Sequence, residues 1–126
     1  SEGNNQVIFC LRGVKTSFNA PHRNMVDFAH IPIVKRLTRM PVCVDPSHSV
    51  GTREASPDGI LDVLHSMSQG IIAGANMVLV DFHPFPTEAL VDGPQALTLD
   101  ELPKFIEDAQ ISREAFKQRV ALWTEK

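Results

Sequence analysis

The sequence predicts an α/β protein in which parallel strands alternate with helices. Three short apolar runs, Val7–Leu11, Pro41–Val44 and Met77–Val80, recur along the 126 residues without polar alternation. Such runs are typical of strands buried on both faces of a parallel sheet. Longer amphipathic stretches separate them, which gives the order β-α-β-α-β-α. Right-handed crossovers then make the three strands neighbours, with the helices packed outside.

The segments between the strands carry helix signals. Ile31–Leu37 predicts a short helix that tolerates Pro32 in its first turn. The second helix is expected to have Ser56 as its N-cap and Pro57 as its first residue, because these residue types favour those positions. Apolar residues at helical spacing continue to Ile72, so this helix should end soon afterwards.

The chain after the third run predicts a loop and two helices. The loop is rich in Pro and Gly, and Thr98–Glu101 has the pattern of a capping box that opens a helix. A last helix is expected to start at Ser112.

Composition excludes several classes of protein. The chain has 12 Lys and Arg against 15 Asp and Glu, a net charge of −3, so no nucleic-acid partner is expected. No apolar run approaches the roughly 20 residues that a membrane span needs. The polar N-terminal residues lack a secretory signal, which predicts a cytoplasmic location. Cys10 and Cys43 lie inside apolar runs and are expected to be reduced, buried thiols.

Each apolar run is followed by polar side chains capable of chemistry. Arg12 follows the first run, Asp45 and His48 follow the second, and Asp81 and His83 follow the third. In parallel α/β proteins the loops after the strands converge at one edge, where binding and catalytic sites are built. We therefore expect these residues to lie close together.

The residue types at this edge favour a metal and an anion. His48, Asp81 and Asp92, with His83 as a further candidate, are ligands suited to a divalent ion such as Mn, Fe, Co or Zn. Arg12 offers a fork of donors that matches phosphate or carboxylate. The spacing alone leaves open the alternative that these are ordinary loop and capping residues.

The length and the strand pattern predict that the chain is part of a larger assembly. A closed eight-unit barrel typically needs about 250 residues, and three units cannot close one. A small open sheet is the alternative, but its apolar strands would leave one face in water.

Four motifs carry a resemblance to a known family. They are Phe9–Thr16, Arg23-Asn24 with Asp27, Asp45–His48 followed by Gly51, and Asp81–Pro84 followed by Ala89–Leu97. Together they resemble the C-terminal part of type I DAHP synthases, the enzymes that make 3-deoxy-D-arabino-heptulosonate 7-phosphate. The β subgroup, which shares its fold with Kdo-8-phosphate synthase, is the most similar.

The resemblance implies a fold and a reaction. The fold is the (β/α)8 TIM barrel, to which residues 1–126 would contribute one partial domain holding strands 6 to 8. The reaction is an aldol-type condensation of phosphoenolpyruvate with erythrose 4-phosphate, which yields DAHP and phosphate. This transferase step opens the shikimate pathway to the aromatic amino acids.

The resemblance also assigns roles to residues. It implies that His48 and Asp92 bind a divalent metal, and it places Asp81 where the family has a glutamate ligand. Arg12 would hold the phosphate of phosphoenolpyruvate, Arg23 would contact substrate, and Arg12 and His48 would be the catalytic residues.

The chain departs from the family in what it lacks. Five strands are missing, and with them a cysteine metal ligand and a Lys-Pro-Arg segment that grips substrates. We therefore expect catalysis only together with the N-terminal barrel segment or another subunit, and we expect a homo-oligomer. The alternatives are a non-catalytic stand-alone module and a synthase for a different phosphosugar such as Kdo-8-phosphate.

Overall fold

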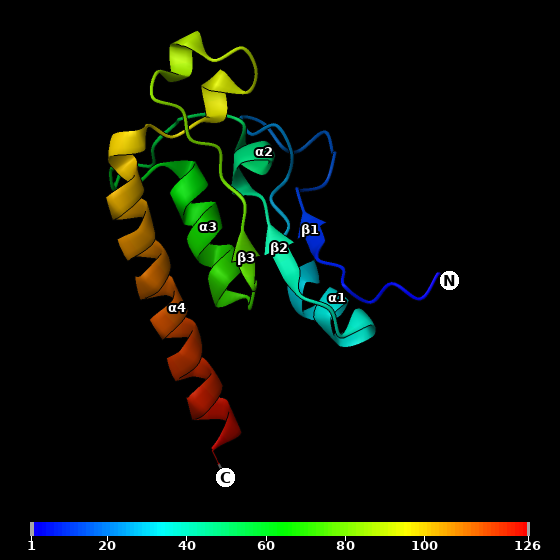
Figure 1. The fold of residues 1–126 in the computed structure, drawn as a ribbon. Coiled ribbons are helices and arrows are strands. Elements are labelled where there is room, and N and C mark those ends of the chain that lie inside the picture. Colours follow the sequence, from blue (N-terminus) through cyan, green and yellow to red (C-terminus); the bar gives the residue numbers. More distant parts are fainter. Residues whose placement is uncertain (1, 126) are drawn as a thin grey trace.

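A computed structural model describes residues 2–125 and contains a three-stranded parallel sheet in the order β1-β2-β3 (Figure 1). The strands are β1 (Phe9–Leu11), β2 (Val42–Val44) and β3 (Met77–Val78). Each lies within one of the apolar runs, and their parallel pairing confirms the predicted topology.

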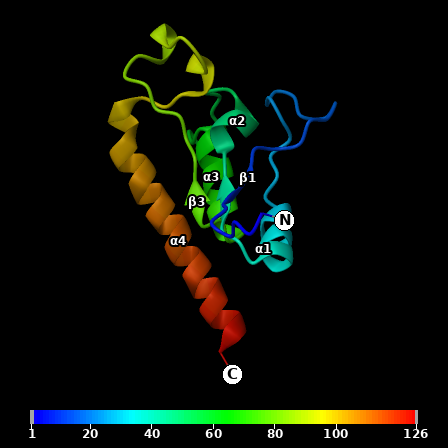
Figure 2. The same cartoon turned by 45° about the vertical axis from the view of Figure 1, so that its right-hand side comes forward.

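Helices connect the strands in the predicted alternation. They are α1 (His30–Thr38), α2 (Pro46–Val50), α3 (Asp62–Ile72) and α4 (Leu102–Thr124). The last helix packs along α3 and extends well past its end (Figure 2). Within residues 2–125, no helix combines the length and the apolar character that a membrane crossing requires.

The main core lies between β2 and the helices. Val42 and Val44 are buried against Ile31 of α1 and against Ala75, which follows α3. Gly70 of α3 lies so close to β2 that an added Cβ would be 2.7 Å from Cγ1 of Val44. Both helices therefore cover the same face of the sheet.

The opposite face of the sheet is open. Met77 and Leu79 are 46% and 48% exposed to solvent, and Cys10 is also exposed. Cys43 is buried because Cys10 and Met77 flank it on the two neighbouring strands. The expectation of two buried thiols is thus right for Cys43 and wrong for Cys10, which lies on the edge strand of this open face.

A second core cluster supports the loops at the carboxyl ends of the strands. Val50, Val63 and Leu97 are buried together. Nearby, Arg53 and Glu101 form a two-pronged ion pair with N–O distances of 2.7 and 3.0 Å. The Arg53 guanidinium holds the pKa of Glu101 at about 2, well below its usual 4.5. Residues 48 positions apart are therefore tied together beside the strand ends.

The start of the second helix differs from the prediction. Ser56 is not an N-cap; it begins a turn in which the Gly59 N–H donates to the Ser56 carbonyl at 2.9 Å. Gly59 has a φ of +83°, which is incompatible with a helix, so α3 starts later, at Asp62.

The sequence predicted two helices at the C-terminus, but the structure has one continuous helix, α4. The capping box of Thr98 and Glu101 forms as predicted, at a 3-10 turn leading into α4. Ser112 lies inside α4, where its hydroxyl donates to the Asp108 carbonyl at 3.0 Å and contacts Ser68 of α3 at 2.7 Å. Serine is a common N-cap, but a serine whose hydroxyl donates to a carbonyl one turn earlier can lie inside a continuous helix.

Candidate metal centre

The three predicted ligands converge at the carboxyl edge of the sheet. His48 lies on α2, directly after β2, while Asp81 and Asp92 lie on the segment after β3, at the same end of the molecule (Figure 1). One ligand atom from each lies within 4.8 Å of the others. Nε2 of His48 is 3.6 Å from Asp92 and 4.0 Å from Asp81. Side chains from two separate segments of the chain are thus brought to one point.

A short helix positions His48. Asp45 is its N-cap, Pro46 is its first residue, and Gly51 ends it with a φ of +71°. This short element brings the imidazole back over the end of β2. The Nδ1 side of the ring faces Asp45, at 2.7 Å.

Asp81 is held by contacts on both its backbone and its side chain. Its N–H donates to the Ser47 hydroxyl at 3.0 Å, and its carbonyl accepts from the Leu97 N–H at 2.9 Å. Its carboxylate accepts from Nε2 of Gln95 at 2.6 Å. The side chain is therefore fixed although it follows the last strand of an open sheet.

Asp92 occupies an unusual backbone conformation. Its φ is +54°, in the left-handed region that few non-glycine residues adopt. The next residue, Gly93, lies against the Pro86 carbonyl, where a Cβ would overlap the oxygen. Such strain is typical of functional loops, where the surrounding structure maintains it.

Two arginines flank the three ligands. Nε of Arg12 is 3.3 Å from Asp45, and Nη1 of Arg23 is 3.6 Å from Asp92. Their side chains are 59% and 52% exposed, so each has a solvent-facing end. The turn after Arg12 requires Gly13, whose φ is +93°. A Cβ added there would lie only 2.9 Å from the Met25 carbonyl oxygen.

His83 lies outside the ligand group. Its Nδ1 accepts a hydrogen bond from the Phe85 N–H at 3.0 Å, and its backbone N–H donates to Leu97. Within residues 2–125, the one group with metal-binding geometry is His48, Asp81 and Asp92. The further candidate, His83, is therefore a turn residue.

The donor set fits the ions that the sequence suggests. One imidazole and two carboxylates are ligands that Mn, Fe, Co and Zn accept, and three protein ligands leave coordination positions for a substrate. The adjoining arginines add positive charge suited to phosphate. This arrangement can bind an anionic substrate beside a Lewis acid.

Gln95 is a residue of the candidate site that the sequence analysis did not single out. It is 2% exposed and connects two parts of the site, because its amide donates to Asp81 while its oxygen accepts from Arg23 at 3.2 Å. A single glutamine in a loop carries no signal of such a bridge. The D-P-x-H pattern, in contrast, is an N-cap signal that would have paired Asp45 with His48.

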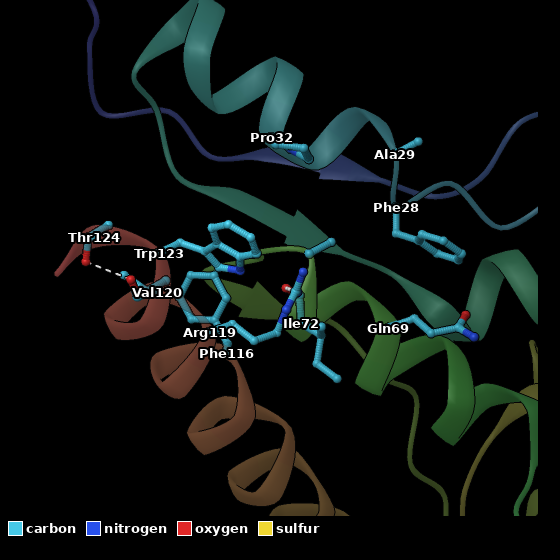
Figure 3. Close-up of a pocket in the computed structure, with 11 residues that line it drawn as sticks. Phe28, Ala29, Pro32, Gln69, Ile72, Phe116, Arg119, Val120, Trp123 and Thr124 are labelled. Atoms are coloured by element: carbon cyan, nitrogen blue, oxygen red, sulfur yellow. Dashed lines mark hydrogen bonds between the residues drawn. The ribbon is translucent and has the colours of Figure 1, made fainter. Parts of the chain in front are cut away.

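A further cavity lies away from this site. It has a volume of about 700 Å³ and lies between α1, the end of α3 and the last turns of α4, with Phe116, Val120 and Trp123 among its lining residues (Figure 3). None of the three candidate ligands lines this cavity, and their side chains are 17%, 32% and 35% exposed for His48, Asp81 and Asp92.

Comparisons with known protein sequences identify similar proteins. Residues 1–119 match the family described as "DAHP synthetase I family". The Thermotoga maritima protein "phospho-2-dehydro-3-deoxyheptonate aldolase" is 33% identical over 121 residues, which are 95% of this chain and 33% of that protein. A Legionella pneumophila "2-dehydro-3-deoxyphosphooctonate aldolase" is 29% identical over 122 residues, 94% of this chain and 43% of that protein.

Solved structures give the same result. The crystal structure of the Thermotoga maritima DAHP synthase superposes with a TM-score of 0.78 at 34% identity, covering 90% of this chain and 31% of that one. A truncated form of the enzyme gives a TM-score of 0.77 and is covered to 40%. The chain thus spans between about a third and two fifths of these relatives. It is an α/β partial unit that matches a portion of a TIM-barrel DAHP synthase, and it belongs to the DAHP synthetase I family.

Proposed function

We propose that this chain supplies the metal-binding and phosphate-binding strands of a synthase that condenses phosphoenolpyruvate with erythrose 4-phosphate. The products are DAHP and inorganic phosphate. The observation that carries the proposal is the convergence of His48, Asp81 and Asp92 within 4.8 Å, beside two arginines and at the carboxyl edge of the sheet. Family membership supplies the reaction class.

The chain's own residues have defined parts in this proposal. His48, Asp81 and Asp92 hold a divalent metal, which supplies Lewis-acid stabilisation of the charge that develops on the aldehyde oxygen. Arg12 binds the phosphate of phosphoenolpyruvate through the exposed end of its guanidinium, and Arg23 contacts substrate. The new carbon–carbon bond joins the methylene carbon of phosphoenolpyruvate to the aldehyde carbon, which takes up a proton on its oxygen. One water molecule adds to the carbon that bears the phosphate, and the bond to that group breaks, so inorganic phosphate leaves.

Asp81 is shorter by one methylene than the glutamate expected from the family resemblance. It still reaches the ligand group, because Gln95 and the backbone contacts to Ser47 and Leu97 fix its position. We therefore infer that this carboxylate retains the ligand role.

We further propose that catalysis requires the N-terminal part of the barrel. The exposed Cys10, Met77 and Leu79 on the open face of the sheet favour burial against further strands. In this arrangement the chain is one part of a cytoplasmic enzyme, and the remaining metal ligand and substrate contacts come from the added strands.

A chimera tests the proposal. The segment of the Thermotoga maritima synthase that matches this chain is replaced by residues 1–126, and phosphate release from the two substrates is measured with Mn²⁺. We expect turnover by the chimera and none by the 126-residue chain alone. A folded, metal-loaded chimera without turnover would contradict the proposal, and an active monomer of the isolated chain would contradict the need for the missing strands.

Substitution of His48 provides the test of the ligand assignment. In the chimera, His48→Ala should lower Mn²⁺ affinity by more than about 100-fold, beyond the range for lost outer-shell contacts. His83→Ala is the matched control, because that histidine also follows a strand but lies outside the ligand group. Metal content measured by mass spectrometry should fall in the first variant and stay unchanged in the second; equal metal content in both would refute the assignment.

A different aldehyde acceptor is the second candidate. The Legionella pneumophila relative carries the name "2-dehydro-3-deoxyphosphooctonate aldolase", at an identity only slightly below that of the Thermotoga protein. The same chimera should therefore be assayed with a five-carbon aldose phosphate, and a preference for that acceptor would select this alternative. A chimera that binds metal but accepts neither sugar would instead indicate a non-catalytic module.

A further inference from the structure

Asp45 is a buried carboxylate at the base of the site, and the proposed chemistry does not use it directly. Its side chain is 0% exposed. Oδ1 accepts from the His48 backbone N–H at 3.0 Å, while Oδ2 contacts Nδ1 of His48 at 2.7 Å and Nε of Arg12 at 3.3 Å. A buried carboxylate without partners would be costly, and here the two oxygens divide the partners between them.

The contact with Nδ1 determines which imidazole nitrogen is free. A carboxylate can only accept, so the neutral ring must carry its proton on Nδ1 in order to donate to Asp45. Nε2 then has its lone pair exposed on the other side of the ring, where it faces Asp92 and Asp81 at 3.6 and 4.0 Å. That is the form of histidine able to bind a metal through Nε2.

We propose that Asp45 is a positioning residue, which fixes His48 in the Nδ1–H form and so directs Nε2 into the ligand group. It holds Arg12 with the same oxygen, so the proposed metal site and the proposed phosphate site share one buried anchor. The metal-binding role of this ring orientation rests on the proposed function, whereas the orientation itself follows from the contacts of Asp45.

Capping a helix does not account for both oxygens. The N-cap role requires only the acceptor Oδ1, and asparagine performs that role about as well as aspartate. In Asp45→Asn, the side-chain oxygen can still accept from the His48 N–H. The amide NH₂ then replaces Oδ2 opposite the ring, where it can only donate. Nδ1 must become the acceptor, and the imidazole proton moves to Nε2.

Nitrogen NMR of the metal-free 126-residue chain tests this directly. ¹⁵N shifts of the histidine rings are recorded at a pH above the imidazole titration range, so that each ring is neutral. We expect His48 to be Nδ1-protonated in the wild-type chain and Nε2-protonated in Asp45→Asn. The wild-type measurement needs no variant, so a folding defect cannot obscure it. Mixed protonation or Nε2–H in the wild-type chain would overturn the proposal.

Metal affinity gives the second readout. Binding of Mn²⁺ to the same chain should weaken by about 10- to 100-fold in Asp45→Asn, the range seen when a partner of a metal-bound histidine is removed. Asp62→Asn is the matched control: Asp62 contacts Nε2 of His22 at 2.8 Å, a similar carboxylate–imidazole pair away from the ligand group. Circular dichroism checks that both variants remain folded, and equal loss of affinity in both would overturn the proposal.

The two measurements separate this inference from the proposed function. If the ring is Nδ1-protonated but the chain and the chimera bind no metal, the proposed metal site fails and the Asp45 orientation stands. If metal binds and the ring state does not respond to Asp45→Asn, the positioning role fails and the metal site stands.

Discussion

Neighbouring residues on two strands can have opposite environments, as Cys10 and Cys43 do. They are paired in register on β1 and β2, yet Cys10 is exposed and Cys43 is 3% exposed. Burial, with the nearby Cys10 thiol and Asp45 carboxylate, raises the pKa of Cys43 from 9.0 to about 12. Only the thiolate reacts with alkylating reagents.

This contrast predicts selective labelling. At pH 8 burial and the raised pKa keep Cys43 as a thiol, so iodoacetamide should modify the folded chain at Cys10 and leave Cys43 intact. Peptide mass spectrometry locates the label, and Cys10→Ser should be almost inert while Cys43→Ser labels at the wild-type rate. Labelling of Cys43 as fast as Cys10 in the folded chain would contradict the packing described for β2.

The sequence predicted which residues are the candidate ligands, but not the hydrogen bonds that connect them to the rest of the site. Sequence reasoning placed His48 and Asp81 at strand ends that share a carboxyl edge, and it named Asp92 as a further ligand. The bridge through Gln95 was not predictable, since it depends on the loop after β3 folding back over Asp81. Hydrogen bonds between residues 14 or more positions apart leave no periodic signal in the chain.

At the scale of elements, the contact between α3 and β2 determines how close the helix can lie to the sheet. Alanine in place of a helix-interior glycine ordinarily stabilises by about 1 kcal/mol. At Gly70, however, the new Cβ would lie 2.7 Å from Cγ1 of Val44, which is itself buried. Overpacking of a core typically costs about 1–3 kcal/mol, so the packing cost outweighs the propensity gain.

We therefore expect Gly70→Ala to lower the free energy of unfolding by up to about 2 kcal/mol, the packing cost less the propensity gain. Urea unfolding followed by circular dichroism measures the change. Combining it with Val44→Ala, which removes the overlapping methyl groups, should make the effect of Gly70→Ala smaller or favourable. Equal destabilisation by Gly70→Ala in the wild-type chain and in the Val44→Ala variant would refute the steric explanation.

Element boundaries show where local rules and tertiary structure compete. Ser56 and Ser112 both match N-cap preferences, yet neither starts a helix. Ser56 instead donates to Asp62 at 3.1 Å, at the true start of α3, and Ser112 is buried between α4 and α3. Serine hydroxyls satisfy several local arrangements, so the surrounding packing decides which one forms.

For the whole molecule, stability depends on ties between distant segments. Arg53 joins the segment after α2 to Glu101, and it also donates to the Ala96 carbonyl at 2.9 Å. Because the folded-state pKa of Glu101 is lowered from 4.5 to about 2, its contribution to stability is fully present above about pH 4.5. That contribution is lost as the pH falls towards about 2.

The unfolding free energy should therefore fall with acidification over this window, and part of that slope should belong to the Arg53–Glu101 pair. Glu101→Gln should unfold with a shallower pH dependence between about pH 4.5 and 2. Arg53→Gln should give the same reduction, because it removes the partner that lowers the pKa. A wild-type slope in the Arg53 variant would show that the pair does not cause the acid sensitivity.

The chain by itself determined its fold class, its strand order and the identity of its candidate ligands. The fold class and the strand order follow from apolar runs of a few residues. The candidate ligands follow from the polar groups after those runs and from the family resemblance. Tertiary structure decided what required two distant segments to meet: the approach of His48 to Asp81 and Asp92, the fixing of Asp81 by Gln95, and the exposure of Cys10 on an open face. The physical reason is that the direction and burial of a side chain depend on its neighbours in space, and these neighbours can come from distant parts of the sequence.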